Sequence, residues 1–296
     1  MPDRSNFRQP TLLVVGCGDI GLRVLALLRG RWRVLALTSS PDRAALLRQA
    51  GAVPIVANLD QPATLRRLVG LADVVLHLVP PATHGSTDRR TAHLLRVLSC
   101  CGRLRRLVYG STTGVYGDAA GAQFDETRSV APATDRARRR VHAEAQLRAF
   151  GRRTGVPVSL LRIPGIYAAD RVGGHPRERL ERGAPVLRAE DDVYTNHIHA
   201  DDLARASVAA LHRGLPQRVV NVCDDTDLRM GDYFDLAAEL CGLPRPPRLS
   251  RVQAAAVLSP MQLSFMGESR RIQNQRLKQE LRLRLRYPTV LQGLLA

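Results

Sequence analysis

The feature that most constrains this sequence is a short loop with three glycines, Gly16-Cys17-Gly18-Asp19-Ile20-Gly21. The apolar run before it, residues 11–15, is typical of a buried strand, and residues 19–29 have the pattern of a helix that ends at Gly30. In such a setting the first glycine allows a tight turn, the second lets the backbone approach a pyrophosphate, and the third lets the helix pack closely on the strand. The free N–H groups and the partial positive charge at the start of a helix favour phosphate. All six residues of the loop are therefore predicted to form a dinucleotide-binding site.

The loop carries one residue that does not suit a phosphate. Asp19 would repel the pyrophosphate if its carboxylate pointed toward it. Arg23 lies four residues further on, one helical turn away, so we expect Asp19 to turn outward and pair with it.

The rest of the first half repeats the alternation of apolar runs and helical stretches. The runs predicted to form further buried strands are residues 33–37, 53–57, 74–78, 107–109 and 158–163. Alternation of this kind predicts an α/β fold with a doubly wound parallel sheet, of the Rossmann type, over residues 11–165. Beyond Pro164 glycines and prolines interrupt the pattern, so residues 166–296 are expected to form mainly a smaller C-terminal substrate lobe, with about 196–225 returning to the Rossmann core. Residues 1–10 are predicted to be a loose N-terminus.

The end of the second predicted strand bears on which dinucleotide is bound. An acidic residue there would hydrogen-bond the ribose hydroxyls of NAD, but the sequence has Thr38, Ser39 and then Arg43 instead. Hydroxyl groups beside a guanidinium suit a 2′-phosphate, so NADP is the preferred cofactor and NAD the alternative.

Composition narrows the range of partners. The formal net charge of +17 comes almost entirely from arginines spread over many segments, with Lys278 the only lysine, and aromatic residues make up only 4% of the chain. A nucleic-acid module more usually concentrates its charge on one face and interleaves aromatics, so we expect no nucleic-acid partner; polyanion binding stays as a weaker alternative. No apolar run approaches the ~20 residues that span a bilayer. The five cysteines are odd in number and lack CxxC spacing, which predicts reduced thiols and a cytoplasmic protein without a metal site.

Five further segments occur in an order that resembles the extended, atypical branch of the short-chain dehydrogenase/reductase superfamily, the epimerase/dehydratase-like and YeeZ-like proteins. These segments are Asn58-Leu59-Asp60, residues 77–81 (HLVPP), 109–117 (YGSTTGVYG), 161–167 (LRIPGIY) and 196–204 (NHIHADDLA). The resemblance implies that the cofactor contacts also include Asn58, Leu59, His77, Val79, Pro80, Pro164 and Ile166. It further implies that a hydroxyl, here that of Thr112, holds a substrate oxygen.

The same resemblance implies a Tyr-x-x-x-Lys pair for proton transfer, and this pair is missing. Counting back from the helix segment at 144–149 (EAQLRA) puts Arg136 at the tyrosine position and Arg140 at the lysine position. Because Lys278 is the only lysine, such a pair would need a tyrosine at 274, where Asn274 stands. Arginine cannot act as a proton donor near neutral pH, although Arg140 could still hydrogen-bond a nicotinamide ribose.

Several other groups are candidates to replace the missing pair. Tyr116 lies near the expected site and could donate a proton, or could simply pack against the strand end. His142 is better explained as a histidine on a helix surface. His197 and His199 share one face of a strand and precede Asp201 and Asp202, but we interpret this segment as structural, with the aspartates opening a helix, and not as a metal site.

The sequence therefore predicts an NAD(P)(H)-binding, epimerase/dehydratase-like oxidoreductase whose Tyr–Lys site is degenerate. Its substrate is expected to be a small molecule, and the arginines around Arg270 and Arg286 would suit one that bears a phosphate or a nucleotide. The alternative is a redox-inert protein that senses NADP(H) and reports its occupancy to a partner.

Overall fold

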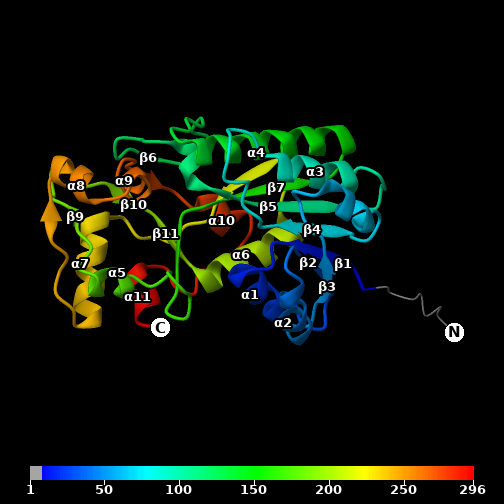
Figure 1. Cartoon of the computed structure of the whole chain (residues 1–296), viewed down its shortest axis with the longest axis horizontal. Helices are drawn as coiled ribbons and strands as arrows, with labels where there is room; N and C mark the ends of the chain where they lie inside the picture. The colour runs from blue at the N-terminus through cyan, green and yellow to red at the C-terminus, as the bar shows by residue number, and fades with distance from the viewer. Residues whose placement is uncertain (1–8) are drawn as a thin grey trace. The chain divides into compact units, whose positions relative to one another are not determined.

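A computed structural model describes residues 9–296, so residues 1–8 of the predicted loose N-terminus lie outside the described part. A seven-stranded sheet has the order β12-β7-β5-β4-β1-β2-β3 (Figure 1). Its strands are β1 (Thr11–Val15), β2 (Arg33–Thr38), β3 (Val53–Val56), β4 (Val74–His77), β5 (Arg106–Thr112), β7 (Val158–Ile163) and β12 (Arg218–Asn221). The pairings β1–β2, β1–β4, β2–β3 and β4–β5 are all parallel. The predicted doubly wound Rossmann-type sheet is confirmed.

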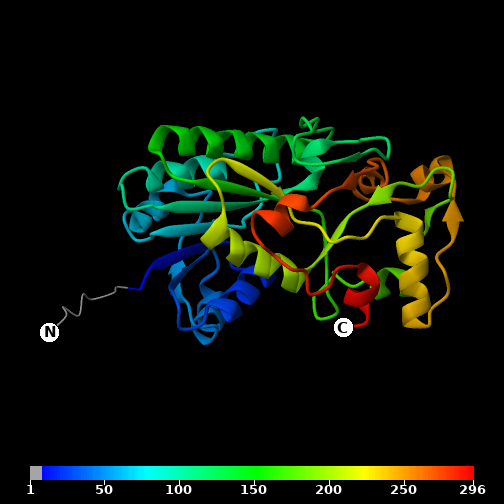
Figure 2. The ribbon, with the colours of Figure 1, turned by 180° about the vertical axis from the view of Figure 1, so that it is seen from behind.

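Helices cover the two faces of this sheet, and α1 and α3 lie on opposite faces (Figures 1 and 2). The helices are α1 (Asp19–Leu28), α2 (Ala44–Gln49), α3 (Arg89–Leu98), α4 (Asp135–Thr154), α5 (Arg177–Glu181), α6 (Ala200–Arg213), α7 (Met230–Cys241), α8 (Arg251–Val257), α9 (Pro260–Phe265), α10 (Gln275–Gln279) and α11 (Val290–Leu294). Helix α1 buries Ile20, Val24, Leu25 and Leu28 on one face, as its apolar spacing predicts. No helix of the described residues is long and apolar enough to cross a membrane.

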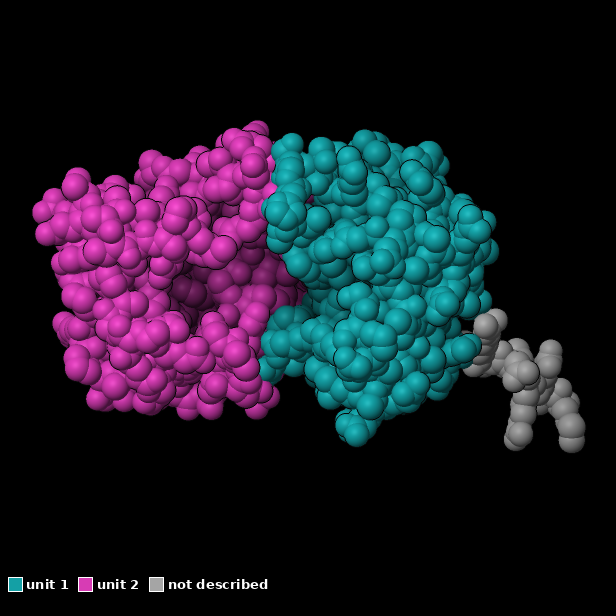
Figure 3. Space-filling model, in the orientation of Figure 1, with its two compact units in different colours: residues 1–110, 142–160, 207–218 teal, residues 111–141, 161–206, 219–296 magenta. Residues whose placement is uncertain are grey.

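The chain divides into two compact units (Figure 3). Unit 1 comprises residues up to 110 with 142–160 and 207–218, and unit 2 comprises residues 111–141, 161–206 and 219–296. The first boundary thus falls at residue 110 and differs from the predicted one at 165. Residues 111–141 belong to unit 2 because they are tied to its later segments: the Glu126 carboxylate accepts a hydrogen bond from the backbone of Asn221 at 2.8 Å, and β6 pairs with β15.

Unit 2 has a core of its own, which includes Tyr167, Phe234, Ala237 and Val290. Its short strands and turns are β6 (Gln123–Phe124), β8 (Gly165–Tyr167), β9 (Val186–Leu187), β10 (Tyr194–Thr195), β11 (His197–His199), β13 (Leu228–Arg229), β14 (Arg248–Leu249), β15 (Arg271–Ile272) and the 3-10 turn η3 (Thr113–Tyr116). Unit 1 has two such turns, η1 (Pro41–Arg43) and η2 (Pro62–Leu68). Pro41 begins η1, and helix α2 follows directly at Ala44.

Candidate functional site

The three glycines of the loop have different environments. Gly16 has φ +91°, and a Cβ there would lie 2.6 Å from Cγ2 and 2.8 Å from the backbone N of Val79. At Gly21 a Cβ would lie 3.1 Å from the Sγ of Cys17 and 3.3 Å from the carbonyl oxygen of Gly16. At Gly18 a Cβ would meet no atom within 4 Å. Gly16 and Gly21 are thus required by the protein's own packing, whereas Gly18 borders open space.

The start of helix α1 faces the same space. The residue before the helix is Gly18, and no side chain caps the first turn. Uncapped N–H groups at a helix start are donors for an anion. The Asp19 carboxylate lies 3.0 Å from Nε of Arg23, which confirms the predicted pair. Ile20, the next residue of α1, is buried.

A cavity of about 420 Å³ opens beside the loop, at the carboxyl ends of β1, β2, β3 and β4. The residues that line it are Gly16, Cys17, Gly18, Leu37, Thr38, Ser39, Arg43, Ala57, Asn58, Leu59, Asp60, Leu78, Val79, Pro80 and Arg90. Most of the residues predicted to contact the cofactor in unit 1 are therefore brought together. His77 is not among them: it is fully buried, its Nε2 lies 3.0 Å from Oγ1 of Thr91, and its ring packs on Tyr109. The side chain of His77, at the end of β4, thus lies in the core, and its contact with a cofactor stays a prediction.

Arg43 holds the glycine loop from the side of β2. Its guanidinium donates a hydrogen bond to the carbonyl oxygen of Cys17 at 2.8 Å. Thr38 and Ser39 lie on the same wall of the cavity, and Thr38 donates to the carbonyl oxygen of Ser40 at 3.1 Å. Burial raises the pKa of the Cys17 thiol to about 11, so this cysteine is a neutral packing group and no nucleophile.

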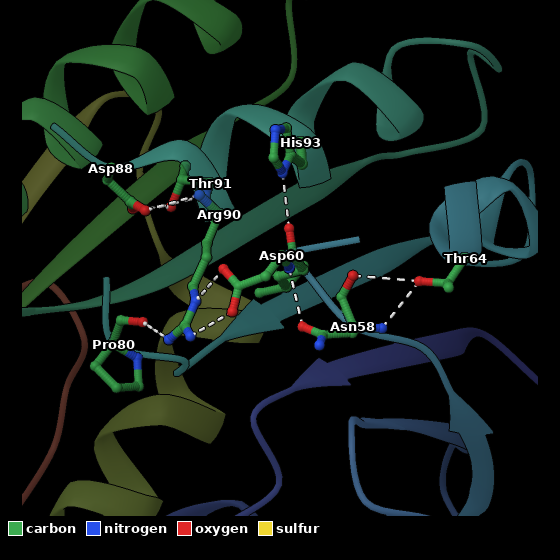
Figure 4. A network of polar contacts seen from close by, with 9 residues as sticks. Asn58, Asp60, Thr64, Pro80, Asp88, Arg90, Thr91 and His93 are labelled. Atoms are coloured by element: carbon green, nitrogen blue, oxygen red, sulfur yellow. Dashed lines mark hydrogen bonds and ion pairs between the residues drawn. The ribbon is translucent and has the colours of Figure 1, made fainter. Parts of the chain in front are cut away.

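The lining of the cavity also contains an ion pair that the sequence patterns did not reveal. Arg90 donates to both carboxylate oxygens of Asp60, from Nε at 2.8 Å and from Nη2 at 2.6 Å, and also to the carbonyl oxygen of Pro80 at 3.2 Å (Figure 4). This contact lowers the pKa of the Asp60 carboxyl. Thirty positions separate the two residues, so no local spacing could have predicted the pair.

In unit 2 the side chains that the family resemblance predicts to be catalytic are in contact with other groups of the protein. Thr112 begins η3, and its hydroxyl oxygen accepts a hydrogen bond from the backbone N–H of Gly114 at 3.3 Å. Tyr116 is fully buried and donates to Oδ1 of Asn221 at 2.8 Å, while the guanidinium of Arg162 lies over its ring at 4.5 Å. Burial raises the pKa of the Tyr116 hydroxyl. The Tyr116 hydroxyl thus has a buried partner within unit 2.

Arg136 and Arg140 lie one turn apart on α4. The guanidinium of Arg136 lies over the ring of Phe265 at 4.5 Å. Burial lowers the pKa of Arg136 most; the Glu268 carboxylate raises this pKa, and neighbouring arginines, Arg140 among them, lower it. Arg270 pairs with Glu268 at 2.5 Å. Arg136 thus lies among several arginines and the Glu268 carboxylate.

The other predicted positions also find structural partners. The only lysine, Lys278, pairs with Asp225 at 2.6 Å. Pro164 lies between β7 and β8, and Ile166 in β8 pairs with β11; both belong to unit 2 and neither lines the cavity of unit 1. His142 accepts a hydrogen bond from the backbone of Asp88 at 3.0 Å.

The two histidines of β11 are core residues. His197 stacks on Tyr233 with ring centroids 4.2 Å apart, and His199 packs on Tyr287 at 4.0 Å. Burial lowers the pKa of His197 to about 4. Among residues 9–296 no three histidine, cysteine or acidic side chains are arranged to hold a metal ion.

No sequence pattern indicated the buried carboxylate of Asp224 in unit 2. Asp224 follows β12, is 3% exposed, and accepts a hydrogen bond from the backbone of Thr226 at 3.0 Å. Burial raises its pKa to about 7. An adjacent pair of aspartates in a loop gives no sign that one of them is buried, so the sequence carried no usable signal.

Three features define a dinucleotide-binding Rossmann protein: the glycine loop, the uncapped start of α1, and the cavity at the carboxyl ends of the parallel strands. The model of the NAD dependent epimerase/dehydratase family matches residues 12–223, and the chain belongs to this family. It is 25% identical over 242 residues to protein YeeZ of Escherichia coli K12, which covers 79% of this chain and 84% of that protein.

The chain is also similar to a plant enzyme in sequence and to a bacterial protein in structure. A trifunctional UDP-glucose 4,6-dehydratase/epimerase/reductase of Arabidopsis thaliana is 25% identical over 161 residues, which is 51% of this chain but only 23% of the plant enzyme. A functionally unknown conserved protein from Silicibacter pomeroyi has a similar structure, with a TM-score of 0.82 and 33% sequence identity over 97% of both chains.

Proposed function

We propose that this protein binds NADP(H) in the cavity of unit 1, as an epimerase/dehydratase-like oxidoreductase of the atypical type that lacks the Tyr–Lys pair. The observation that carries the proposal is the open space at Gly18, where a Cβ would meet nothing within 4 Å beside an uncapped helix start. A backbone kept bare on the side of a cavity suits the close approach of a pyrophosphate. The bound dinucleotide would supply hydride transfer.

The preference for NADP over NAD rests on the β2 wall. Thr38, Ser39 and Arg43 line the cavity there, and no carboxylate lies at the end of β2. Guanidinium and hydroxyl groups donate hydrogen bonds to a 2′-phosphate, which NAD lacks.

The residues of unit 2 indicate what kind of substrate would suit the protein. The Thr112 hydroxyl is half-buried and retains a proton with which to hold a substrate oxygen. Arg136, Arg140 and Arg270 favour an anionic small molecule, such as one bearing a phosphate or a nucleotide, because planar guanidiniums bind phosphate in a bidentate manner. The plant relative is named for UDP-linked sugars, which are substrates of this chemical class.

A second candidate is a redox-inert protein that binds NADP(H) and signals its occupancy. It is favoured by the partners of the groups that could move a proton: the hydroxyl of Tyr116 is buried against Asn221, and Lys278 is paired with Asp225. Under this candidate the arginines of α4 hold an anion without any turnover.

The test is a titration of the protein with NADPH and with NADH, followed by nicotinamide fluorescence and calorimetry. We expect one equivalent of NADPH to bind at micromolar concentration and NADH to bind more weakly. Absence of binding at millimolar cofactor would refute the proposal. Incubation of the bound NADPH with nucleotide-linked sugars then separates the two candidates, since oxidation of the cofactor supports the enzyme and prolonged stability supports the sensor.

A further inference from the structure

The Asp60–Arg90 ion pair lines the proposed cofactor cavity. The glycine loop does not depend on this pair for its own conformation. Both residues line the cavity, together with Arg43. An unpaired carboxylate in the lining of this cavity would repel the additional phosphate of NADP, because like charges at a protein surface repel one another. The double contact with Arg90, at 2.8 and 2.6 Å, offsets that charge, so that Arg43 remains as the net charge of the residues that line the cavity.

We propose that Arg90 is a specificity-determining residue: by neutralising Asp60 it makes the cavity selective for the 2′-phosphorylated dinucleotide. This inference rests on the proposed function and adds to it a residue on α3, far in sequence from the Thr38, Ser39 and Arg43 group. The geometry assigns Arg90 an electrostatic role on the ligand, acting through Asp60.

A purely structural role for Arg90 is the competing explanation, and the neighbouring contacts argue against it. The segment 58–60 is already held by hydrogen bonds that do not involve Arg90 (Figure 4). The backbone N–H of Asn58 donates to Thr64, that of Asp60 donates to the Asn58 side chain at 2.9 Å, and the carbonyl oxygen of Leu59 lies 2.7 Å from Nδ1 of His93. The conformation of the loop is therefore fixed without the Arg90 side chain.

The start of α3 is likewise independent of that side chain. The carboxylate of Asp88 caps the helix by accepting from the backbone N–H groups of Arg90 and Thr91. A substitution at position 90 keeps both donors. We therefore expect a side chain of similar length without charge, as in Arg90→Met, to change the charge of the cavity and to remove the exposed hydrogen bond to the carbonyl oxygen of Pro80, while the loop and the helix start keep their conformation.

The experiment is a double-mutant cycle read with both cofactors. Arg90→Met, Asp60→Asn and the double variant are titrated with NADPH and NADH at low salt, and their melting temperatures are recorded. We expect Arg90→Met to weaken NADPH binding roughly tenfold while NADH binding changes by less than about threefold. In the double variant, where the unpaired carboxylate is gone, the preference for NADPH returns to within about threefold of the parent.

Arg89→Met is the matched control, since it removes the same charge one residue earlier, from an exposed position that does not line the cavity. It should leave both affinities unchanged. An equal loss of NADPH and NADH in Arg90→Met, or no recovery in the double variant, would overturn the inference while leaving the proposed function intact. If the parent protein binds neither dinucleotide or prefers NADH, the proposed function fails first, and this inference fails with it.

Discussion

The cavity of unit 1 and the catalytic positions of unit 2 differ in what they require of the sequence. In unit 1 the features suited to a ligand are mostly backbone: bare glycines, an uncapped helix, and the ends of parallel strands. In unit 2 the family's chemistry depends on the identity of two side chains, and both positions are arginine. The proposed binding site therefore depends mostly on backbone, whereas the family's proposed catalytic site would depend on two side chains.

The contrast extends to the residues that might replace the missing pair. Tyr116, His197 and Asp224 are buried groups in unit 2 with shifted pKa values. Shifted pKa values often mark active sites, but structural burial produces the same shifts. Here the partners of these groups are core residues: Asn221 for Tyr116, Tyr233 for His197 and Thr226 for Asp224. We infer that unit 2 uses these polar groups to hold its own fold.

The largest effect is expected from filling the open space beside Gly18 in unit 1, which tests the contrast between the two units most directly. In Gly18→Leu the backbone can keep its conformation, because Gly18 has φ −83°, and the new side chain meets no protein atom at its Cβ. It would occupy the space of the pyrophosphate, so we expect NADPH affinity to fall at least a thousandfold, about 4 kcal/mol, with no loss in melting temperature. Gly102→Leu, at an exposed glycine that also borders open space, is the control. Unchanged NADPH affinity in Gly18→Leu would mean that the cavity beside the loop does not bind the dinucleotide.

These regions also differ in how far the sequence predicts them. The strand–loop–helix at residues 11–28 follows from apolar runs, glycines and a helical period, all of which act locally, and the structure reproduces β1 and α1 to within a residue. The Asp60–Arg90 pair, the burial of Asp224 and the core position of His77 depend on which distant segments meet, and no local pattern encodes that. The boundary of unit 1 at residue 110 has the same origin, because contacts such as Glu126 to Asn221 join segments far apart in the chain.

A smaller but distinct effect is expected from Asp224→Asn. Burial raises the pKa of Asp224 from 3.8 to about 7, so the native state holds this proton more tightly than the unfolded chain does. The stabilising contribution is therefore present below about pH 4 and is lost as the pH rises toward 7. The asparagine variant keeps Oδ1 for Thr226 and carries no charge. We expect it to be more stable than the parent by about 2–3 kcal/mol at pH 8 and equally stable at pH 4.

The measurement is the free energy of unfolding in urea across this pH range. Asp232→Asn, at an exposed position in the first turn of α7, serves as the control and should not show the pH-dependent gain. Equal pH slopes for the parent and Asp224→Asn would show that the carboxyl is not buried as described. Loss of turnover in Asp224→Asn with an unaltered pH slope would instead make it a proton donor, and the comparison between the two units would fail.

The smallest expected effect, and the finest test of the comparison, is that of Tyr116→Phe. The change removes the hydroxyl that donates to Asn221 at 2.8 Å and leaves a buried amide oxygen without that donor. A loss of about 1–2 kcal/mol in the free energy of unfolding is expected, with NADPH affinity unchanged. Tyr194→Phe is the control, because the described residues offer no hydrogen-bond partner to the hydroxyl of this half-buried tyrosine, and its stability should stay within about 0.5 kcal/mol. If Tyr116 were the proton donor of a reaction, Tyr116→Phe would abolish turnover at nearly full stability. A packing role predicts the reverse, since the hydrogen bond to Asn221 then matters to the fold and not to the chemistry.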